Sequence, residues 1–138
     1  MSTTEEMLAR VPMFRDLPKN TIKRLEKLAS PRTFKAGQDI VKEGDEGVGF
    51  YLITDGKVEV SRSGKSLSTL GQGDFFGEMA LLDHHRRSAT VKALEPTSCL
   101  GMLRSDFVAE LRANPELAIE MLAAMSRRLR ELDAKISD

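Results

Sequence analysis

The sequence has little of what secreted, membrane-spanning and polyanion-binding proteins need. Cys99 is the only cysteine among 138 residues, so no disulfide can form within the chain. No apolar run approaches the roughly 20 residues of a membrane span, and the first residues, MSTTEEMLAR, lack the basic and apolar stretches of a secretion signal. The 21 basic and 21 acidic residues leave no net charge, so no broad positive field can hold a nucleic acid. We therefore expect a cytoplasmic protein with no membrane contact and no direct nucleic-acid partner.

Helices are predicted at both ends of the chain, whose length fits a single domain. Apolar residues recur at helical spacing between Pro18 and Pro31, and the two prolines bound that stretch. Toward the other end, Asn114 can cap a helix and Pro115 suits its first position. A long terminal helix is therefore predicted from Pro115 to about Ile136.

The long terminal helix carries its apolar residues in a narrow seam. The intervals alternate between four and three residues, which is the heptad spacing of helices that pair with one another. The seam comprises Ala118, Leu122, Met125, Leu129, Leu132 and Ile136. Two interpretations are open: the helix pairs with a second copy of the chain in a homodimer, or the seam packs back onto the strands.

The middle of the chain, between residues 32 and 103, is predicted to form antiparallel strands. Turn signals recur there about every ten residues, and regular turns of this kind separate short strands. Residues 57–61 alternate polar and apolar side chains with the period of a strand, and residues 50–53 form a β-rich, more buried run. The Asp55-Gly56 pair between these runs is predicted to be a hairpin turn, because glycine supplies the positive φ that such turns need.

One segment predicts an anion site. Phe76 ends an apolar run and Gly77 opens a short helical one, so the backbone amides of Glu78, Met79 and Ala80 can point at an anion. The dipole of a helix start favours negative charge at that place. Glycine and alanine leave the approach of such a ligand clear.

Two charged residues indicate which class of anion this segment binds. Arg87 follows after a short polar loop and can make a charge-assisted contact to the single negative charge of a cyclic phosphodiester. Glu78 would be repelled by an anion unless it accepts hydrogen bonds from neutral donors, and a sugar hydroxyl is such a donor. A phosphate beside a sugar indicates a nucleotide.

These residues carry a resemblance to a known family. Residues 76–82, Phe-Gly-Glu-Met-Ala-Leu-Leu, and residues 87–91, Arg-Ser-Ala-Thr-Val, resemble the phosphate-binding cassette of cyclic nucleotide-binding domains. Such domains occur in catabolite activator proteins, kinase regulatory subunits and cyclic nucleotide-gated channels, and the similarity extends over nearly the whole chain. The resemblance implies a mainly β fold with flanking helices: an eight-stranded antiparallel, jelly-roll-like β-roll with N-terminal helices, a short cassette helix and a long C-terminal helix.

The resemblance also implies a division of the chain and a role for it. Residues 1–138 would form one domain, with N-terminal helices in 1–30, the β-roll in 31–103 and C-terminal helices in 104–138. The cassette would occupy residues 76–91. The expected role is that of a non-catalytic regulatory sensor, in which binding of a cyclic nucleotide moves the C-terminal helix as a lid.

By resemblance, the cassette residues hold the phosphate and ribose of the ligand. Gly77, Glu78, Met79 and Ala80 would line the phosphate and ribose, with Glu78 taking the ribose hydroxyl and Arg87 the exocyclic phosphate oxygens. Arg86 stands where many members have proline and is not counted as a ligand-binding residue.

The residues expected to hold the base match those of the family less closely than the cassette residues do. Threonine at the position of Ser88 is associated with cGMP preference in parts of the family, whereas serine there occurs in cAMP-binding bacterial members. The expected ligand is cAMP more than cGMP, but this residue alone does not decide between them. Leu132 and Asp133 stand where the catabolite activator reads the base with a Thr-Ser pair, so Arg128 is expected to contact the base instead. Apolar walls for the purine are expected from Val60, Leu67 and Leu70.

Three other functions are weighed against this one. His84 and His85 suggest a metal-dependent, cupin-like enzyme, but no third histidine exists and adjacent side chains on extended backbone point apart, so no metal and no catalytic cofactor is expected. The second alternative is a dimerisation module with a vestigial pocket. Direct DNA binding is not expected either, because the chain ends at Asp138, near where a helix-turn-helix would start in the catabolite activators.

Overall fold

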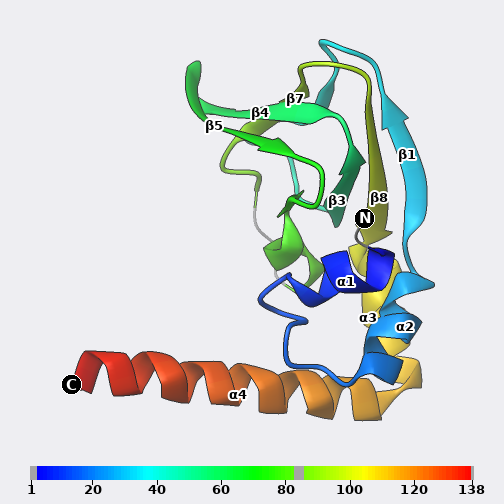
Figure 1. Ribbon diagram of the computed structural model, residues 1–138, viewed down its shortest axis with the longest axis vertical. Helices are drawn as coiled ribbons and strands as arrows, with labels where there is room; N and C mark the ends of the chain where they lie inside the picture. The colour runs from blue at the N-terminus through cyan, green and yellow to red at the C-terminus, as the bar shows by residue number, and fades with distance from the viewer. Residues whose placement is uncertain (1–2, 83–85, 138) are drawn as a thin grey trace.

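The computed structural model describes residues 3–82 and 86–137 as two antiparallel sheets with helices gathered at one end (Figure 1). The predicted mainly β fold with eight strands and flanking helices is confirmed. The strands are β1 (Ser30–Phe34), β2 (Asp39–Val41), β3 (Gly49–Asp55), β4 (Lys57–Arg62), β5 (Lys65–Gly71), β6 (Phe75–Phe76), β7 (Thr90–Ala93) and β8 (Thr97–Leu103). The helices are α1 (Thr4–Ala9), α2 (Lys19–Glu26), the short 3-10 helix η1 (Glu78–Leu81), α3 (Arg104–Ala113) and α4 (Pro115–Ser137).

The two sheets have four strands each. One has the order β1-β8-β3-β6 and the other the order β2-β7-β4-β5. β4 and β5 form a two-residue hairpin in which Arg62 pairs with Lys65, and the intervening Ser63 and Gly64 have φ of 50° and 81°. Positive φ at both central residues gives a turn whose twist matches that of the strands.

The prediction of a hairpin at Asp55-Gly56 is wrong. β3 pairs with β6 and β8, whereas β4 pairs with β5 and β7, so the turn joins two sheets instead of two paired strands. Glycine is still required there: φ of Gly56 is 104°, and a Cβ on this residue would lie 2.5 Å from Oγ1 of Thr97. The sequence marks the turn, but the strand partners are set by contacts between residues that lie far apart in the chain.

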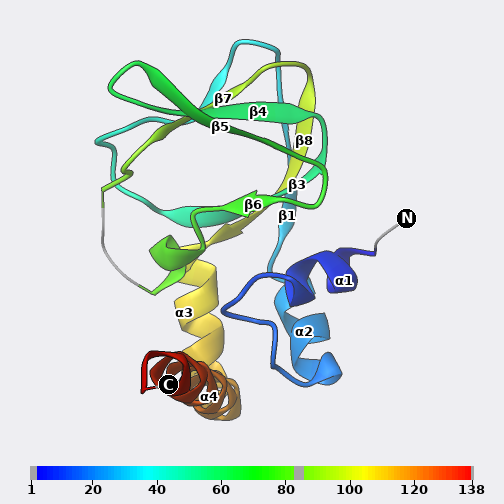
Figure 2. The same ribbon diagram turned by 60° about the vertical axis from the view of Figure 1, so that its left-hand side comes forward.

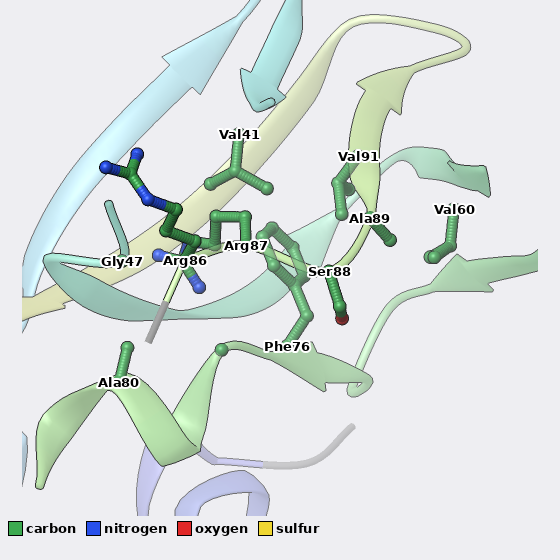
Figure 3. A pocket seen from close by; sticks show the side chains of 11 residues that line it. Val41, Gly47, Val60, Phe76, Ala80, Arg86, Arg87, Ser88, Ala89 and Val91 are labelled. Atoms are coloured by element: carbon green, nitrogen blue, oxygen red, sulfur yellow. The ribbon is translucent and has the colours of Figure 1, made fainter. Parts of the chain in front are cut away.

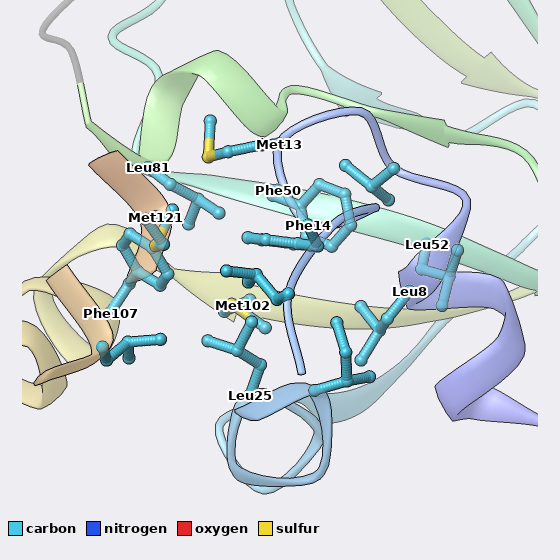
Figure 4. Packing of buried hydrophobic residues seen from close by; sticks show 14 of the residues in the cluster. Leu8, Met13, Phe14, Leu25, Phe50, Leu52, Leu81, Met102, Phe107 and Met121 are labelled. Carbon is cyan, nitrogen blue, oxygen red and sulfur yellow. The ribbon is translucent and has the colours of Figure 1, made fainter. Parts of the chain in front are cut away.

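The main core lies between the first sheet and the helices (Figure 4). The ring of Phe14 packs edge-on against Phe50 of β3, with centroids 6.1 Å apart, and lies at a tilt of 47° to Phe107 of α3, with centroids 6.2 Å apart. All three rings are fully buried. The helical end of the molecule is therefore anchored to the sheet that ends in β6, immediately before η1.

α4 buries a different face from the predicted seam. Leu117, Met121 and Ala124 are buried in the main core, whereas the seam residues Leu122 and Leu129 are 66% and 68% exposed. These leucines lie on the solvent side, whereas Met125, another seam residue, is partly buried and packs against the main core.

Polar contacts tie α4 to the N-terminal part of the chain. The buried hydroxyl of Thr21 in α2 donates to a carboxylate oxygen of Glu120 over 2.5 Å. Farther along the helix, Arg15 and Glu131 form an ion pair at 3.6 Å. α4 accordingly lies beyond α3, on the far side from β4 and β5 (Figure 1 and Figure 2). None of the helices in the described part of the chain is long and apolar enough to cross a membrane.

Candidate functional site

A cavity of about 300 Å³ opens between β6 with η1 on one side and β7 with the segment before it on the other (Figure 3). This volume is at the lower end of the range for small-molecule sites. The described residues of its wall include two arginines and no carboxylate, and most of the others are apolar or glycine. They are Val41, Gly47, Val60, Phe76, Gly77, Ala80, Arg86, Arg87, Ser88, Ala89 and Val91.

Gly77 is the turn between β6 and η1. Its φ is 82°, a left-handed conformation that side chains other than hydrogen disfavour. A Cβ on this residue would lie 2.3 Å from Nη1 of Arg87 and 2.9 Å from the carbonyl oxygen of Gly49. Glycine is required at this position by both its backbone conformation and the close approach of the arginine.

Arg87 is fixed in the cavity wall at both its backbone and its side chain. Its amide donates to the carbonyl of Asp45 over 2.7 Å, and its carbonyl accepts from the amide of Gly44 over 2.8 Å. The side-chain Nη2 donates to the carbonyl of Gly49 over 2.6 Å. The backbone contacts fix the place of Arg87 in the wall, and the side-chain contact holds its guanidinium against Gly77.

The electrostatics of Arg87 favour an anionic partner. Burial lowers the pKa of this guanidinium from its ordinary value, and the charge interaction with Tyr51 opposes that shift. Arginine stays protonated near neutral pH in proteins, so the cavity contains a partly desolvated positive charge. Such a charge is stabilised by a nearby anion more strongly than an arginine on the open surface would be.

An aromatic stack supports the floor of the cavity. Phe76 pairs with Tyr51 across β3 and β6, and their rings stack with centroids 5.2 Å apart and an interplanar angle of 22°. Phe34 of β1 packs edge-on against Tyr51, with centroids 6.2 Å apart. Phe76 is thereby held in the wall from behind by two further rings.

The structure brings most of the predicted site residues together. Six of them line the cavity: Val60, Phe76, Gly77, Ala80, Arg87 and Ser88. The backbone of Glu78 and Met79 lies in η1, next to the cavity, but the side chains of these two residues lie outside the described part of the structure.

Three other predicted residues are placed elsewhere. Leu70 in β5 is half-buried against the small cluster of Ile53, Val58, Val91 and Cys99, and Leu67 is 53% exposed. Arg128 lies on α4, away from the cavity, and its Nη1 is buried with no hydrogen-bond partner among the described residues. In this arrangement of α4, no part of Arg128 belongs to the cavity wall.

Five wall residues are not among the predicted ligand-binding residues, although Arg86, Ala89 and Val91 lie within the predicted cassette of residues 76–91. Val91 lies in β7, where polar and apolar residues alternate, so its inward direction could be predicted. Val41 follows Ile40 in β2, which has no such alternation. Gly47 and Ala89 carry no such signal, because they lie in loops. Arg86 is not among the predicted ligand-binding residues, but it lies in the wall, and its Nη1 donates to the carbonyl of Gly44 over 2.9 Å.

The described residues do not form a metal site. Across residues 3–82 and 86–137, no group of three or more His, Cys, Asp or Glu side chains could hold a metal ion. His84 and His85 lie outside the described residues. Cys99 is 1% exposed, and burial raises the pKa of its thiol to about 11, so it is a packing residue.

Comparisons with known proteins agree on one family. The model of the cyclic nucleotide-binding domain matches residues 31–114. The cyclic AMP receptor protein of Thermus thermophilus is 35% identical over 130 residues, which are 91% of this chain and 60% of that protein. A cGMP-dependent protein kinase of Toxoplasma gondii is 40% identical over 99 residues, which are 72% of this chain and 10% of the kinase.

A solved structure extends the agreement to three dimensions. The N-terminal domain of a transcriptional regulator from Streptomyces coelicolor matches with a TM-score of 0.81 and 32% identity, over 93% of this chain and 95% of that one. The chain spans less than two thirds of the length of the Thermus relative, so its match concerns one part of a longer protein. On the family model, the sequence identity and the shared fold, the chain belongs to the cyclic nucleotide-binding domain family.

Proposed function

We propose that the chain is a non-catalytic regulatory module that binds a cyclic purine nucleotide, cAMP in preference to cGMP, in the cavity of Figure 3. The observation that carries the proposal is the guanidinium of Arg87, held by Gly49 against Gly77 inside a cavity of about 300 Å³. A cyclic phosphodiester carries one negative charge, which this cation can pair with through charge-assisted hydrogen bonds.

The rest of the wall fits the remainder of a nucleotide. The backbone amides of Glu78 and Met79 would face the phosphate together with Arg87, whereas the amide of Ala80 donates to the carbonyl of Gly77 over 3.0 Å. Glu78 would accept from the ribose hydroxyl. Val41, Val60 and Val91 give an apolar surface on the second sheet for the sugar and the base. The preference for cAMP is supported by the Thermus relative, whose name carries that ligand and which matches 91% of this chain.

Ligand binding would be reported by a movement of α4. In the structure, this helix is held by Thr21 and Arg15 of the N-terminal part and lies away from the cavity. A ligand that gains contacts from α4 in a closed arrangement shifts the population toward that arrangement by the difference in affinity. Arg128 would then approach the base, which also gives its unsatisfied guanidinium nitrogen a partner.

A second candidate function rests on the exposed leucines of α4. Leu122, Leu129 and Leu132 are all more than half exposed and recur at heptad spacing. Such a seam favours a homodimer through α4, with or without a ligand in the cavity. In the form that competes with the first proposal, dimerisation is the function and the cavity is vestigial.

The test is a calorimetric titration of ligand-free protein with a panel of related ligands. cAMP and cGMP are the candidate ligands, adenosine lacks the phosphate, and 5′-AMP has an open, doubly charged phosphate. The proposal expects saturable binding of cAMP, weaker binding of cGMP, and at least tenfold weaker binding of both controls, since each loses or changes the contact to Arg87. Absence of binding by both cyclic nucleotides, in folded and empty protein, would favour the dimerisation function.

A further inference from the structure

The residue that follows Arg87 is held from outside the cavity. β4 and β7 pair as far as Ser61 and Thr90, so the backbone carbonyl of Ser88 lies beyond the last strand pair. The side chain of Arg62 supplies the next contact, because its Nε donates to that carbonyl over 2.9 Å. The guanidinium of Arg62 thus donates to the Ser88 carbonyl in the way that backbone amides donate to carbonyls where β4 and β7 are paired.

The position of Arg62 is itself fixed by the hairpin that follows it. The amide of Ser63 donates to Oε1 of Glu43 over 2.9 Å, and the amide of Glu43 donates to Oγ1 of Thr90 over 2.9 Å. The segment from Ser88 to Thr90 is therefore connected at both ends to the β4–β5 hairpin, directly through Arg62 and indirectly through Glu43.

We propose that Arg62 is a positioning residue for the contact that Ser88 makes with the ligand. The inference rests on the proposed function, because it needs a nucleotide in the cavity. Ser88 lines the cavity, whereas Arg62 is exposed and is not among the wall residues, so it acts only through the backbone of Ser88. A fixed carbonyl restricts the peptide group next to the Cα of Ser88, and with it the direction of the serine side chain. A charged donor such as a guanidinium makes a stronger hydrogen bond to this carbonyl than a neutral donor would.

The test compares cAMP titrations of the wild type, Arg62→Gln, Ser88→Ala and the double variant. Arg62→Gln is expected to weaken cAMP binding about three- to tenfold. In the Ser88→Ala background the same change is expected to have no further effect, because the hydroxyl it positions is gone. Lys65→Gln is the matched control: Lys65 faces Arg62 across the hairpin, is exposed, and loses the same charge.

A second measurement follows the contact itself in the ligand-free protein. Removal of a donor from the Ser88 carbonyl is expected to shift the amide nitrogen signal of Ala89, which belongs to the same peptide group, in Arg62→Gln and not in Lys65→Gln. Equal losses of cAMP affinity in Arg62→Gln and Lys65→Gln would mean that only the charge matters. If Arg62→Gln weakens cAMP binding as much in the Ser88→Ala background as in the wild type, Arg62 acts elsewhere. Either result overturns the inference while leaving the proposed function intact. Failure of the wild type to bind would overturn both.

Discussion

Gly77 and Arg87 occupy the same small volume of the cavity wall. A Cβ on residue 77 would lie 2.3 Å from Nη1 of the arginine, closer than real Cβ contacts come. The glycine and the arginine are ten positions apart in the sequence, and a residue without a side chain is needed at 77 for the arginine to have its observed position. The phosphate site that we propose is built on this pair.

The first prediction concerns Gly77→Ala, which is expected to destabilise the domain and to abolish cAMP binding by displacing Arg87. Gly37→Ala is a matched control, since φ of Gly37 is 86° and nothing lies within 4 Å of an added Cβ. The variant at 77 should lose about 1–3 kcal/mol more stability than the one at 37, because only the former adds a clash to the strained backbone. Chemical unfolding measures the difference, and equal losses would contradict the account.

The second prediction separates the two faces of α4. Leu117 is fully buried and Leu129 is 68% exposed. Leu117→Ala should cost about 2–5 kcal/mol of unfolding free energy, whereas Leu129→Ala should stay within about 0.5 kcal/mol for the monomer. If the exposed seam forms a homodimer, Leu129→Ala should also shift sedimentation toward the monomer. A large loss of monomer stability in Leu129→Ala would mean that the seam is buried within the chain.

The third prediction tests whether α4 has to leave its observed place when the ligand binds. Thr21→Val removes the hydroxyl that donates to Glu120 and keeps the shape of the side chain. The observed arrangement of α4, in which the helix lies away from the cavity, loses a hydrogen bond. The affinity for cAMP should therefore rise about three- to fivefold through a shift of population toward the closed arrangement. Thr33→Val, an exposed change of the same kind on β1, should leave the affinity unchanged. Weaker binding by Thr21→Val would indicate that this contact belongs to the bound form.

The fourth prediction concerns Cys99. Its pKa is raised to about 11 by burial, from an ordinary value of 9.0, so the folded state holds the proton more tightly than the unfolded state. The stability that depends on this thiol is therefore complete below pH 9 and is lost as the pH rises toward about 11. Cys99→Ala should remove that part of the pH dependence. At pH 8, a thiol reagent should modify Cys99 at the rate of unfolding, and rapid modification of folded protein would contradict the burial.

Much of the fold follows from the sequence because its signals are local. Recurring turn residues predict the strands between residues 32 and 103, and the proline boundaries predict the helices near both ends. The corner at Asp55-Gly56 shows the limit of such signals. Glycine marks the turn, but whether the flanking strands pair depends on β7 and β8, which lie some 40 residues farther along the chain.

The site also has features that the sequence predicts and features that depend on tertiary contacts. Gly77 and Arg87 could be predicted, because a positive φ and a cation are chemistries that only a few residues supply. The carbonyl of Gly49 that fixes the arginine could not be predicted, since every residue has one. The place of Arg128 depends on where α4 lies, and that is set by tertiary contacts such as the one between Thr21 and Glu120.

The central claim is that the guanidinium of Arg87 holds the phosphate of a cyclic nucleotide. The most direct measurement is the affinity of ligand-free Arg87→Ala for cAMP beside that of Arg86→Ala, which removes the same charge from the neighbouring residue in the same wall. The account predicts a loss of at least about 100-fold in Arg87→Ala and of less than about fivefold in Arg86→Ala, because only Arg87 is oriented toward Gly77. Equal affinities of the two variants would contradict it.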